Sequence, residues 1–158
     1  MKYNNISFGI DIENNIDLLN KSIFNKSALV IGGAGTIGAS YLKQLLKFKP
    51  SDIVVVDINE NGLAELTRDL RSSNLLNYNP NYITYPVNLL SSTFNKIFES
   101  IDFHIVANFA AHKHVRSEKD SISVEALIKK GKISPILLNT TKIILGKIFI
   151  FLLYILPI

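Results

Sequence analysis

The sequence contains no cysteine, and its N-terminal residues lack the apolar segment of a signal peptide. Without thiols the chain can form neither a disulfide framework nor a thiolate metal site, so a disulfide-stapled secreted domain and a cysteine zinc site are both excluded. A polar N-terminus such as this one argues against secretion. We therefore expect a cytoplasmic protein.

A strong charge excess is also missing. Lys and Arg number 17 against 13 acidic residues, which gives a net charge of +4, and no basic run is interleaved with aromatic residues. This pattern does not favour a nucleic-acid partner. With 158 residues the chain suits one domain with a core, but it is short for a complete two-domain dinucleotide enzyme.

A glycine-rich segment, residues 30–38, lies between an apolar run and a helix-like stretch. Its glycines fit two overlapping registers, both typical of the strand–turn–helix loops that hold the pyrophosphate of a dinucleotide. Glycine permits positive φ in the tight turn and lets backbone N–H groups approach phosphates closely. The cofactor-binding residues predicted here are Gly32, Gly33, Ala34, Gly35, Thr36, Ile37 and Gly38.

Strand-like and helix-like segments alternate along the chain. Strands are expected over 28–31, 53–57, 82–87 and 103–111, and helices over 11–24, 36–48, 59–70 and 91–98. The helix over 36–48 is expected to bury Ile37, Tyr41, Leu45 and Phe48. Asp11, Asn59 or Asn61, and Ser91 or Ser92 are the candidate N-caps. This order predicts an α/β fold with a doubly wound parallel, Rossmann-like sheet that is incomplete, preceded by a short helix.

Asp57 closes the second expected strand, 19 residues after Gly38. A carboxylate at this place accepts hydrogen bonds from the adenosine ribose hydroxyls and repels a 2′-phosphate. Ile58, Asn59 and Glu60 bring no cation that would bind such a phosphate. NAD is therefore favoured over NADP as the cofactor, the alternative for Asp57 being a helix-capping acid.

The ends of the third and fourth expected strands supply further candidates. Asn88 could meet the adenine amino edge, although a polar loop residue is equally natural there. Small residues, among them Ala110 and Ala111, suit either close approach of a ligand or tight packing of a helix on the sheet. His112 and His114 lack a third ligand nearby, so no metal site is predicted.

The last part of the chain differs from the rest. Residues 133–158 carry only Lys142 and Lys147 as charged groups and end in an apolar run of 11 residues, too short for an ordinary membrane span. A buried strand or helix, a membrane anchor and an aberrant terminus from truncation or a shifted reading frame stay open. The expected organisation is an arm over 1–26, a NAD-binding domain over 27–131 and an apolar tail over 132–158.

Three segments together carry a resemblance: the glycine loop, residues 56–63 and residues 108–120. They resemble the extended short-chain dehydrogenase/reductases, and within these the CapD-type polysaccharide biosynthesis proteins, which include nucleotide-sugar 4,6-dehydratases and epimerases. The resemblance extends over residues 27–128. It implies a UDP-sugar substrate and a hydride taken by the nicotinamide from C4 of the sugar. From their residue types, Lys113, His114 and Arg116 could face anionic phosphates of a substrate, the alternative being a solvated basic loop.

The sequence departs from this family in one important respect. Family members carry a Tyr-x-x-x-Lys pair downstream, but no tyrosine of this chain has a lysine four residues later. Catalytic residues are therefore not assigned. We expect the NAD-binding part of a nucleotide-sugar dehydratase or epimerase, truncated and inactive alone. The alternative is a non-catalytic nucleotide-binding module that acts through a partner, forms homo-oligomers through the tail or is attached to a membrane by it.

Overall fold

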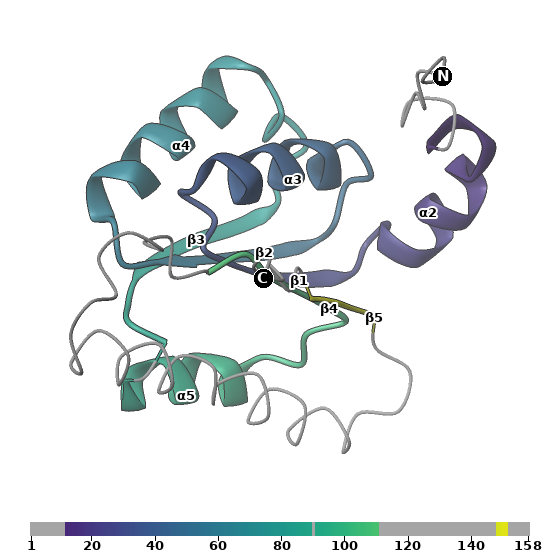
Figure 1. Ribbon diagram of the computed structural model, residues 1–158. Coiled ribbons are helices and arrows are strands. Elements are labelled where there is room, and N and C mark those ends of the chain that lie inside the picture. Colours follow the sequence, from purple (N-terminus) through teal and green to yellow (C-terminus); the bar gives the residue numbers. More distant parts are fainter. Residues whose placement is uncertain (1–11, 90, 111–147, 152–158) are drawn as a thin grey trace, which may run out of the picture.

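The computed structural model describes residues 12–89, 91–110 and 148–151. Its helices are α2 (Ile16–Ile23), α3 (Thr36–Leu46), α4 (Glu60–Ser72) and α5 (Ser92–Ser100). Its strands are β1 (Ser27–Ile31), β2 (Asp52–Asp57), β3 (Asn81–Pro86), β4 (Ile105–Asn108) and β5 (Ile148–Phe151). The strands form one sheet in the order β3-β2-β1-β4-β5, and every neighbouring pair is parallel (Figure 1). The predicted doubly wound α/β fold is confirmed.

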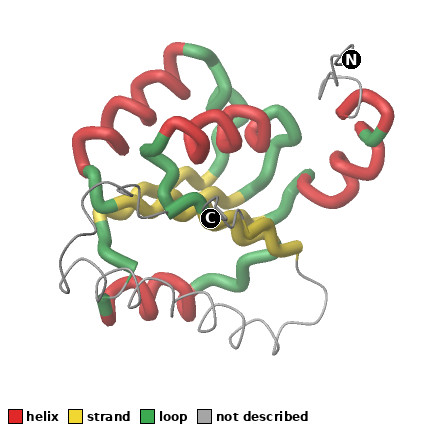
Figure 2. Tube along the Cα trace, in the orientation of Figure 1, coloured by secondary structure: helices red, strands yellow, loops and turns green. Residues whose placement is uncertain are grey.

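Helices cover both faces of the sheet. Figures 1 and 2 show α3 and α4 on one face and α5 on the other. Because successive side chains of a strand point to opposite faces, β1 contributes to two cores. Ala28 and Val30 belong to the core beneath α3 and α4, whereas Leu29 and Ile31 belong to the core that contains the α5 residue Phe94.

The central strands agree with the prediction made from their apolar runs. All five residues of β1 are buried, as are the four inner residues of β2, which is expected of parallel strands covered on both faces. β3 is an edge strand among the described residues and is only partly buried. Pro86 ends it, at the place where a proline without an N–H is tolerated.

Two of the predicted caps are observed. The side chain of Asn59 accepts a hydrogen bond from the Gly62 N–H at the start of α4, and Ser91 accepts one from the Phe94 N–H at the start of α5. The face predicted for α3 is only partly correct. Leu45 and Phe48 are buried, but Ile37 and Tyr41 are half-buried. The buried face of α3 itself is made by Gly38, Leu42, Leu45 and Leu46.

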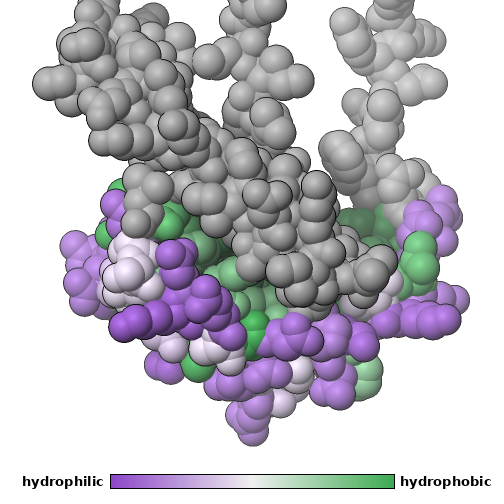
Figure 3. Space-filling view, turned by 90° about the horizontal axis from the view of Figure 1, so that it is seen from below, coloured by the Kyte–Doolittle hydropathy of each residue, from purple (hydrophilic) through white to green (hydrophobic). Residues whose placement is uncertain are grey.

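The helix predicted over 11–24 is interrupted: residues 12–14 are helical, Asn15 lies in a turn, and α2 follows. α2 begins at Ile16 with Asn15 as its N-cap, whereas the predicted cap, Asp11, lies outside the described residues. None of the α2 residues is buried, and Leu18 is 64% exposed. Seen from the α5 side, hydrophobic residues lie among hydrophilic ones on the described surface (Figure 3).

The strands at the other side of the sheet also differ from the expectation. β4 covers only 105–108 of the predicted 103–111, because its pairing with β1 begins at Ile105 and ends at Asn108. β5, from the apolar tail, pairs in parallel with all four residues of β4. The backbone of 148–151 is thus a strand of the same sheet. No helix in the described part of the chain is long and apolar enough to cross a membrane.

Candidate functional site

The glycine loop connects β1 to α3 at the carboxyl edge of the sheet. The Gly32 N–H donates to the Val56 carbonyl over 2.7 Å, which ties the start of the loop to the end of β2. On the other side of β1, the Phe109 N–H donates to the Ile31 carbonyl over 2.8 Å. The loop therefore lies where β1, β2 and β4 all end, which is the usual place for ligands in open α/β sheets.

Steric contacts explain three of the four loop glycines. Gly32 has φ +74°, and a Cβ there would lie 2.6 Å from the Ala110 nitrogen. A Cβ at Gly33 would meet the Val55 side chain at 2.2 Å, and one at Gly38 would lie 2.2 Å from the Gly32 carbonyl oxygen. Side chains at these positions would push apart the loop, the sheet and α3. These glycines therefore keep α3 close to the sheet.

Gly35 is different, because it has space around it. It is exposed, and a Cβ there would have only the Gly32 carbonyl oxygen near it, at 3.4 Å. Gly35 is also the N-cap of α3, with φ −73°, and it supplies no side-chain hydrogen bond to the first turn. The protein's own packing therefore does not require glycine at this position. The missing side chain leaves the positive end of the α3 dipole open to a ligand.

The carboxylate of Asp57 joins two loops. Its Oδ2 accepts the Ala34 N–H of the glycine loop over 3.0 Å, and its Oδ1 accepts the Asn59 N–H over 3.0 Å. Each carboxylate oxygen can accept further hydrogen bonds on its outer side. Asp57 is half-buried at the end of β2. The side chain is thus held in place by backbone donors and can still bind an incoming hydroxyl group.

The first turn of α4 continues this arrangement. Asn59 Oδ1 accepts the Gly62 N–H over 3.0 Å. A Cβ at Gly62 would lie 3.0 Å from the Ala34 Cβ, so glycine allows α4 to approach the glycine loop closely. Asp57, Asn59 and Gly62 therefore connect the α4 N-terminus to the loop at Ala34. The sequence predicted Asn59 as a cap, but it did not predict that α4 approaches the glycine loop at Gly62. The only signal for this contact was a glycine three residues after the candidate cap.

The other predicted residues at this edge are placed as follows. Ala110 follows β4 and is exposed beside Gly32, and its N–H donates to the Asn108 side chain over 3.0 Å. Asn88 follows β3 and is exposed, two residues after Pro86, which is the register partner of Asp57. Its carbonyl accepts from the Ser91 N–H. The predicted residues outside the described part of the chain are Ala111, Lys113 and His114.

One residue of the site escaped the sequence reasoning. Ile58 follows Asp57 directly and is 71% exposed. The only signal in the sequence was an isoleucine just beyond the buried strand, where a polar residue is usual. An exposed apolar surface beside a carboxylate suits a flat, partly apolar ligand group.

Tyr41 lies behind the loop rather than in it. Its ring contacts the Phe109 ring, with centroids 4.9 Å apart, and burial raises the pKa of its hydroxyl to about 12. This contact joins α3 to the end of β4 and thereby supports the loop between them. Among the described residues, no group of three or more His, Asp or Glu side chains could hold a metal ion, while His112 and His114 fall outside that part.

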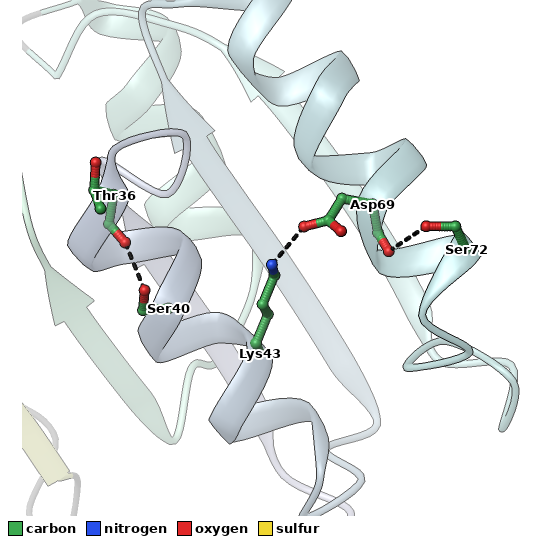
Figure 4. A network of polar contacts seen from close by, with 5 residues as sticks. All are labelled: Thr36, Ser40, Lys43, Asp69 and Ser72. Carbon is green, nitrogen blue, oxygen red and sulfur yellow. Dashed lines mark hydrogen bonds and ion pairs between the residues drawn. The ribbon is translucent and has the colours of Figure 1, made fainter.

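Other polar contacts lie away from this edge. An ion pair between Lys43 and Asp69 connects α3 to α4 (Figure 4). At the amino edge, the Ser27 hydroxyl donates to the Asp102 carbonyl over 2.6 Å and lies 2.7 Å from His104 Nδ1. The backbone N–H of His104 in turn donates to the Ser27 hydroxyl oxygen over 3.2 Å. This pair joins β1 to the start of β4 on the side of the sheet opposite the glycine loop.

Comparison with known proteins identifies the family. Residues 28–129 match the sequence profile of the family described as polysaccharide biosynthesis protein. The chain is 28% identical over 107 residues to the capsular polysaccharide biosynthesis protein CapD of Staphylococcus aureus. It is 49% identical over 51 residues to an uncharacterized membrane protein of Methanocaldococcus jannaschii. These alignments include 66% and 32% of this chain but only 17% and 15% of the two relatives, so the chain spans about a sixth of their length.

A solved structure supports the fold. A candidate short chain dehydrogenase of Escherichia coli CFT073, complexed with NADPH, aligns with a TM-score of 0.57 at 14% identity. The alignment covers 76% of this chain and 53% of that protein. At this identity the likeness establishes the fold alone.

Proposed function

Since this chain belongs to the polysaccharide biosynthesis protein family, we propose that it binds NAD at the carboxyl edge of the sheet and serves a nucleotide-sugar dehydratase or epimerase reaction. The observation that carries the proposal is the hydrogen bond from the Ala34 N–H to Asp57 Oδ2. It places a carboxylate, which ribose hydroxyls require, directly beside a glycine loop, which a pyrophosphate requires. Each feature alone is common, but their contact matches one ligand class.

The residues present fit the pyrophosphate. The space at Gly35 and the uncapped first turn of α3 form a cradle that a Cβ would partly fill. In this proposal the backbone N–H groups of Thr36 and Ile37 bind the phosphate oxygens, favoured by the positive end of the helix dipole. Thr36 and Ile37, in the first turn of α3, lie beside that position. Gly32, Gly33 and Gly38 act indirectly, since they allow the loop to take its shape.

Asp57 and its neighbours fit the adenosine. The outer sides of the Asp57 carboxylate would accept hydrogen bonds from the 2′- and 3′-hydroxyls of the ribose. The exposed Ile58 side chain would contact the adenine ring, and Asn88, beyond the neighbouring strand, would lie near the adenine edge. Asp57 and Glu60 are both anionic next to the 2′ position, so NADP would be disfavoured.

Bound NAD would supply a hydride acceptor for C4 of a UDP-sugar, which is the chemistry implied by the family resemblance. The small residues Ala110 and Ala111 would leave room for the cofactor near the end of β4. Lys113 and His114 stay the proposed contacts to the anionic substrate. Because the sequence holds no Tyr-x-x-x-Lys pair, we expect this chain alone to bind the cofactor without turning over a UDP-sugar.

Isothermal titration calorimetry with NAD⁺ and NADH tests the proposal. The wild-type chain should bind, and Asp57→Ala should lower the affinity by about tenfold or more, since it removes hydrogen bonds to a charged acceptor. Asp69→Asn, which alters an acid at the far end of α4, is the matched control and should bind like the wild type. Equal affinities of wild type and Asp57→Ala would remove the ribose role, and turnover of UDP-N-acetylglucosamine would disprove the expected inactivity.

A further inference from the structure

We propose that Asn59 is a positioning residue that controls how strictly the site discriminates between NADH and NADPH. The inference rests on the proposed dinucleotide function. It concerns a residue that would touch neither the cofactor's reactive part nor its pyrophosphate. Asn59 would act through Asp57, whose carboxylate it holds.

The first step is the fixed orientation of Asp57. Both carboxylate oxygens accept a backbone N–H, one from Ala34 and one from Asn59, each over 3.0 Å. A carboxylate held at both oxygens cannot rotate away from an approaching group without losing these bonds. A 2′-phosphate therefore meets a negative charge that cannot move aside. The same fixed carboxylate presents its outer lone pairs to a ribose diol at little entropic cost.

The second step is the dependence of this orientation on the Asn59 side chain. Asn59 Oδ1 accepts the Gly62 N–H over 3.0 Å, and the Asn59 carbonyl accepts the Leu63 N–H over 3.0 Å. These two bonds fix the Asn59 backbone at φ −91° and ψ 93°, with its own N–H directed at Asp57 Oδ1. If the cap were lost, the first turn of α4 would fray and this N–H would no longer be held.

The third step is the close approach of α4 to the glycine loop. The short distance from a Cβ at Gly62 to the Ala34 Cβ shows that the capped turn packs against the residue whose N–H binds Asp57 Oδ2. Both donors to the carboxylate are therefore adjacent to the same capped turn. Loosening that turn should release both oxygens of Asp57, and the carboxylate could then turn away from a 2′-phosphate.

The test is the ratio of the dissociation constants for NADPH and NADH, measured by calorimetry. Asn59→Ala should lower this ratio by about threefold to tenfold, which corresponds to the usual effect of a lost N-cap. Asn59→Ser retains a capping oxygen and should restore most of the discrimination. Asp69→Asn, at the other end of α4, should leave the ratio as in the wild type. A general loss of stability would weaken both cofactors equally and would not change the ratio.

Amide hydrogen exchange of the cofactor-free protein gives a second readout. Asn59→Ala should speed exchange of the Ala34 and Asn59 N–H groups, while Asn59→Ser should not. An unchanged ratio in an Asn59→Ala protein that still binds NADH would overturn this inference and leave the dinucleotide function intact. Unchanged exchange of both N–H groups would likewise refute the proposed clamp. If the wild type bound neither dinucleotide, the proposed function itself would be wrong.

Discussion

At the scale of single residues, Gly35 and Gly38 show how one motif combines two different requirements. The Cβ of an alanine at Gly38 would overlap with the Gly32 carbonyl oxygen, a backbone atom that cannot move without the loop. The Cβ of an alanine at Gly35 would only touch that same oxygen. Gly38 is therefore required by the fold, whereas the packing of the protein does not require glycine at Gly35, where the proposed pyrophosphate site would require it.

This difference predicts that Gly38→Ala mainly lowers the stability of the protein, whereas Gly35→Ala mainly weakens NAD binding. Gly38→Ala should lower the free energy of unfolding by about 1–3 kcal/mol, as expected for overpacking against backbone. Gly35→Ala should cost about 1 kcal/mol or less but weaken NAD binding by about tenfold or more, since its methyl group would occupy the phosphate position. Urea unfolding and calorimetry measure the two effects. Wild-type affinity in Gly35→Ala would contradict the pyrophosphate assignment.

At the scale of elements, α4 is held to the rest of the protein by two unequal contacts. Leu63, Leu66 and Leu70 are buried against the sheet. Asp69 forms an ion pair with Lys43 of α3, but both side chains are well exposed, at 48% and 40%. Exposed ion pairs contribute little, because water solvates the separated charges well and salt screens their attraction. The apolar face should therefore dominate the attachment of α4.

Substitutions at two adjacent positions of α4 test this ranking. Leu70→Ala should lower the free energy of unfolding by about 2–5 kcal/mol, because Leu70 is fully buried. Asp69→Asn should lower it by less than about 1 kcal/mol, and this loss should shrink further at 1 M salt. Urea unfolding at low and high salt measures both. A larger loss in Asp69→Asn than in Leu70→Ala would show that the ion pair holds α4.

The elements also show what the sequence could predict. β1 and β2 were predictable because short runs of apolar, mainly β-branched residues have few stable alternatives to a strand buried on both faces. The buried face of α3 was only partly predictable, since apolar residues at Ile37, Tyr41, Leu42 and Leu46 offer two overlapping faces, and the close approach at Gly38 selects one.

Contacts between loops could not be predicted in this way. The hydrogen bond between Ala34 and Asp57 joins residues 23 positions apart. It depends on the register in which Ile31 of β1 faces Val56 of β2. Local patterns in the sequence do not specify such a register. For the same reason the sequence predicted a ribose ligand at Asp57 but could not predict that this residue also holds the glycine loop.

At the scale of the whole molecule, shifted pKa values on both sides of neutrality affect stability. Hydrogen bonds from Ser51 and Asn81 lower the pKa of Asp52, so its stabilising contribution is present above the unfolded pKa and is lost as the pH falls through the lower folded value. Asp52 is only half-buried at the start of β2, so solvent screening keeps this effect small. Burial raises the pKa of Tyr41 and of Tyr78 to about 12 and also raises that of Tyr82.

The tyrosines predict a steep loss of stability in alkali. Between about pH 10, where tyrosines of the unfolded chain ionise, and about pH 12, where Tyr41 and Tyr78 ionise in the folded protein, the unfolded state binds fewer protons. The free energy of unfolding must then fall as the pH rises.

Tyr78→Phe should make this fall shallower. At pH 7 it should be neutral or stabilising, because the Tyr78 hydroxyl is shielded from solvent and has no hydrogen-bond partner among the described residues. Urea unfolding at pH 7, 10 and 11 measures both effects, and an equal slope in wild type and Tyr78→Phe would exclude Tyr78 as a source of the alkaline instability.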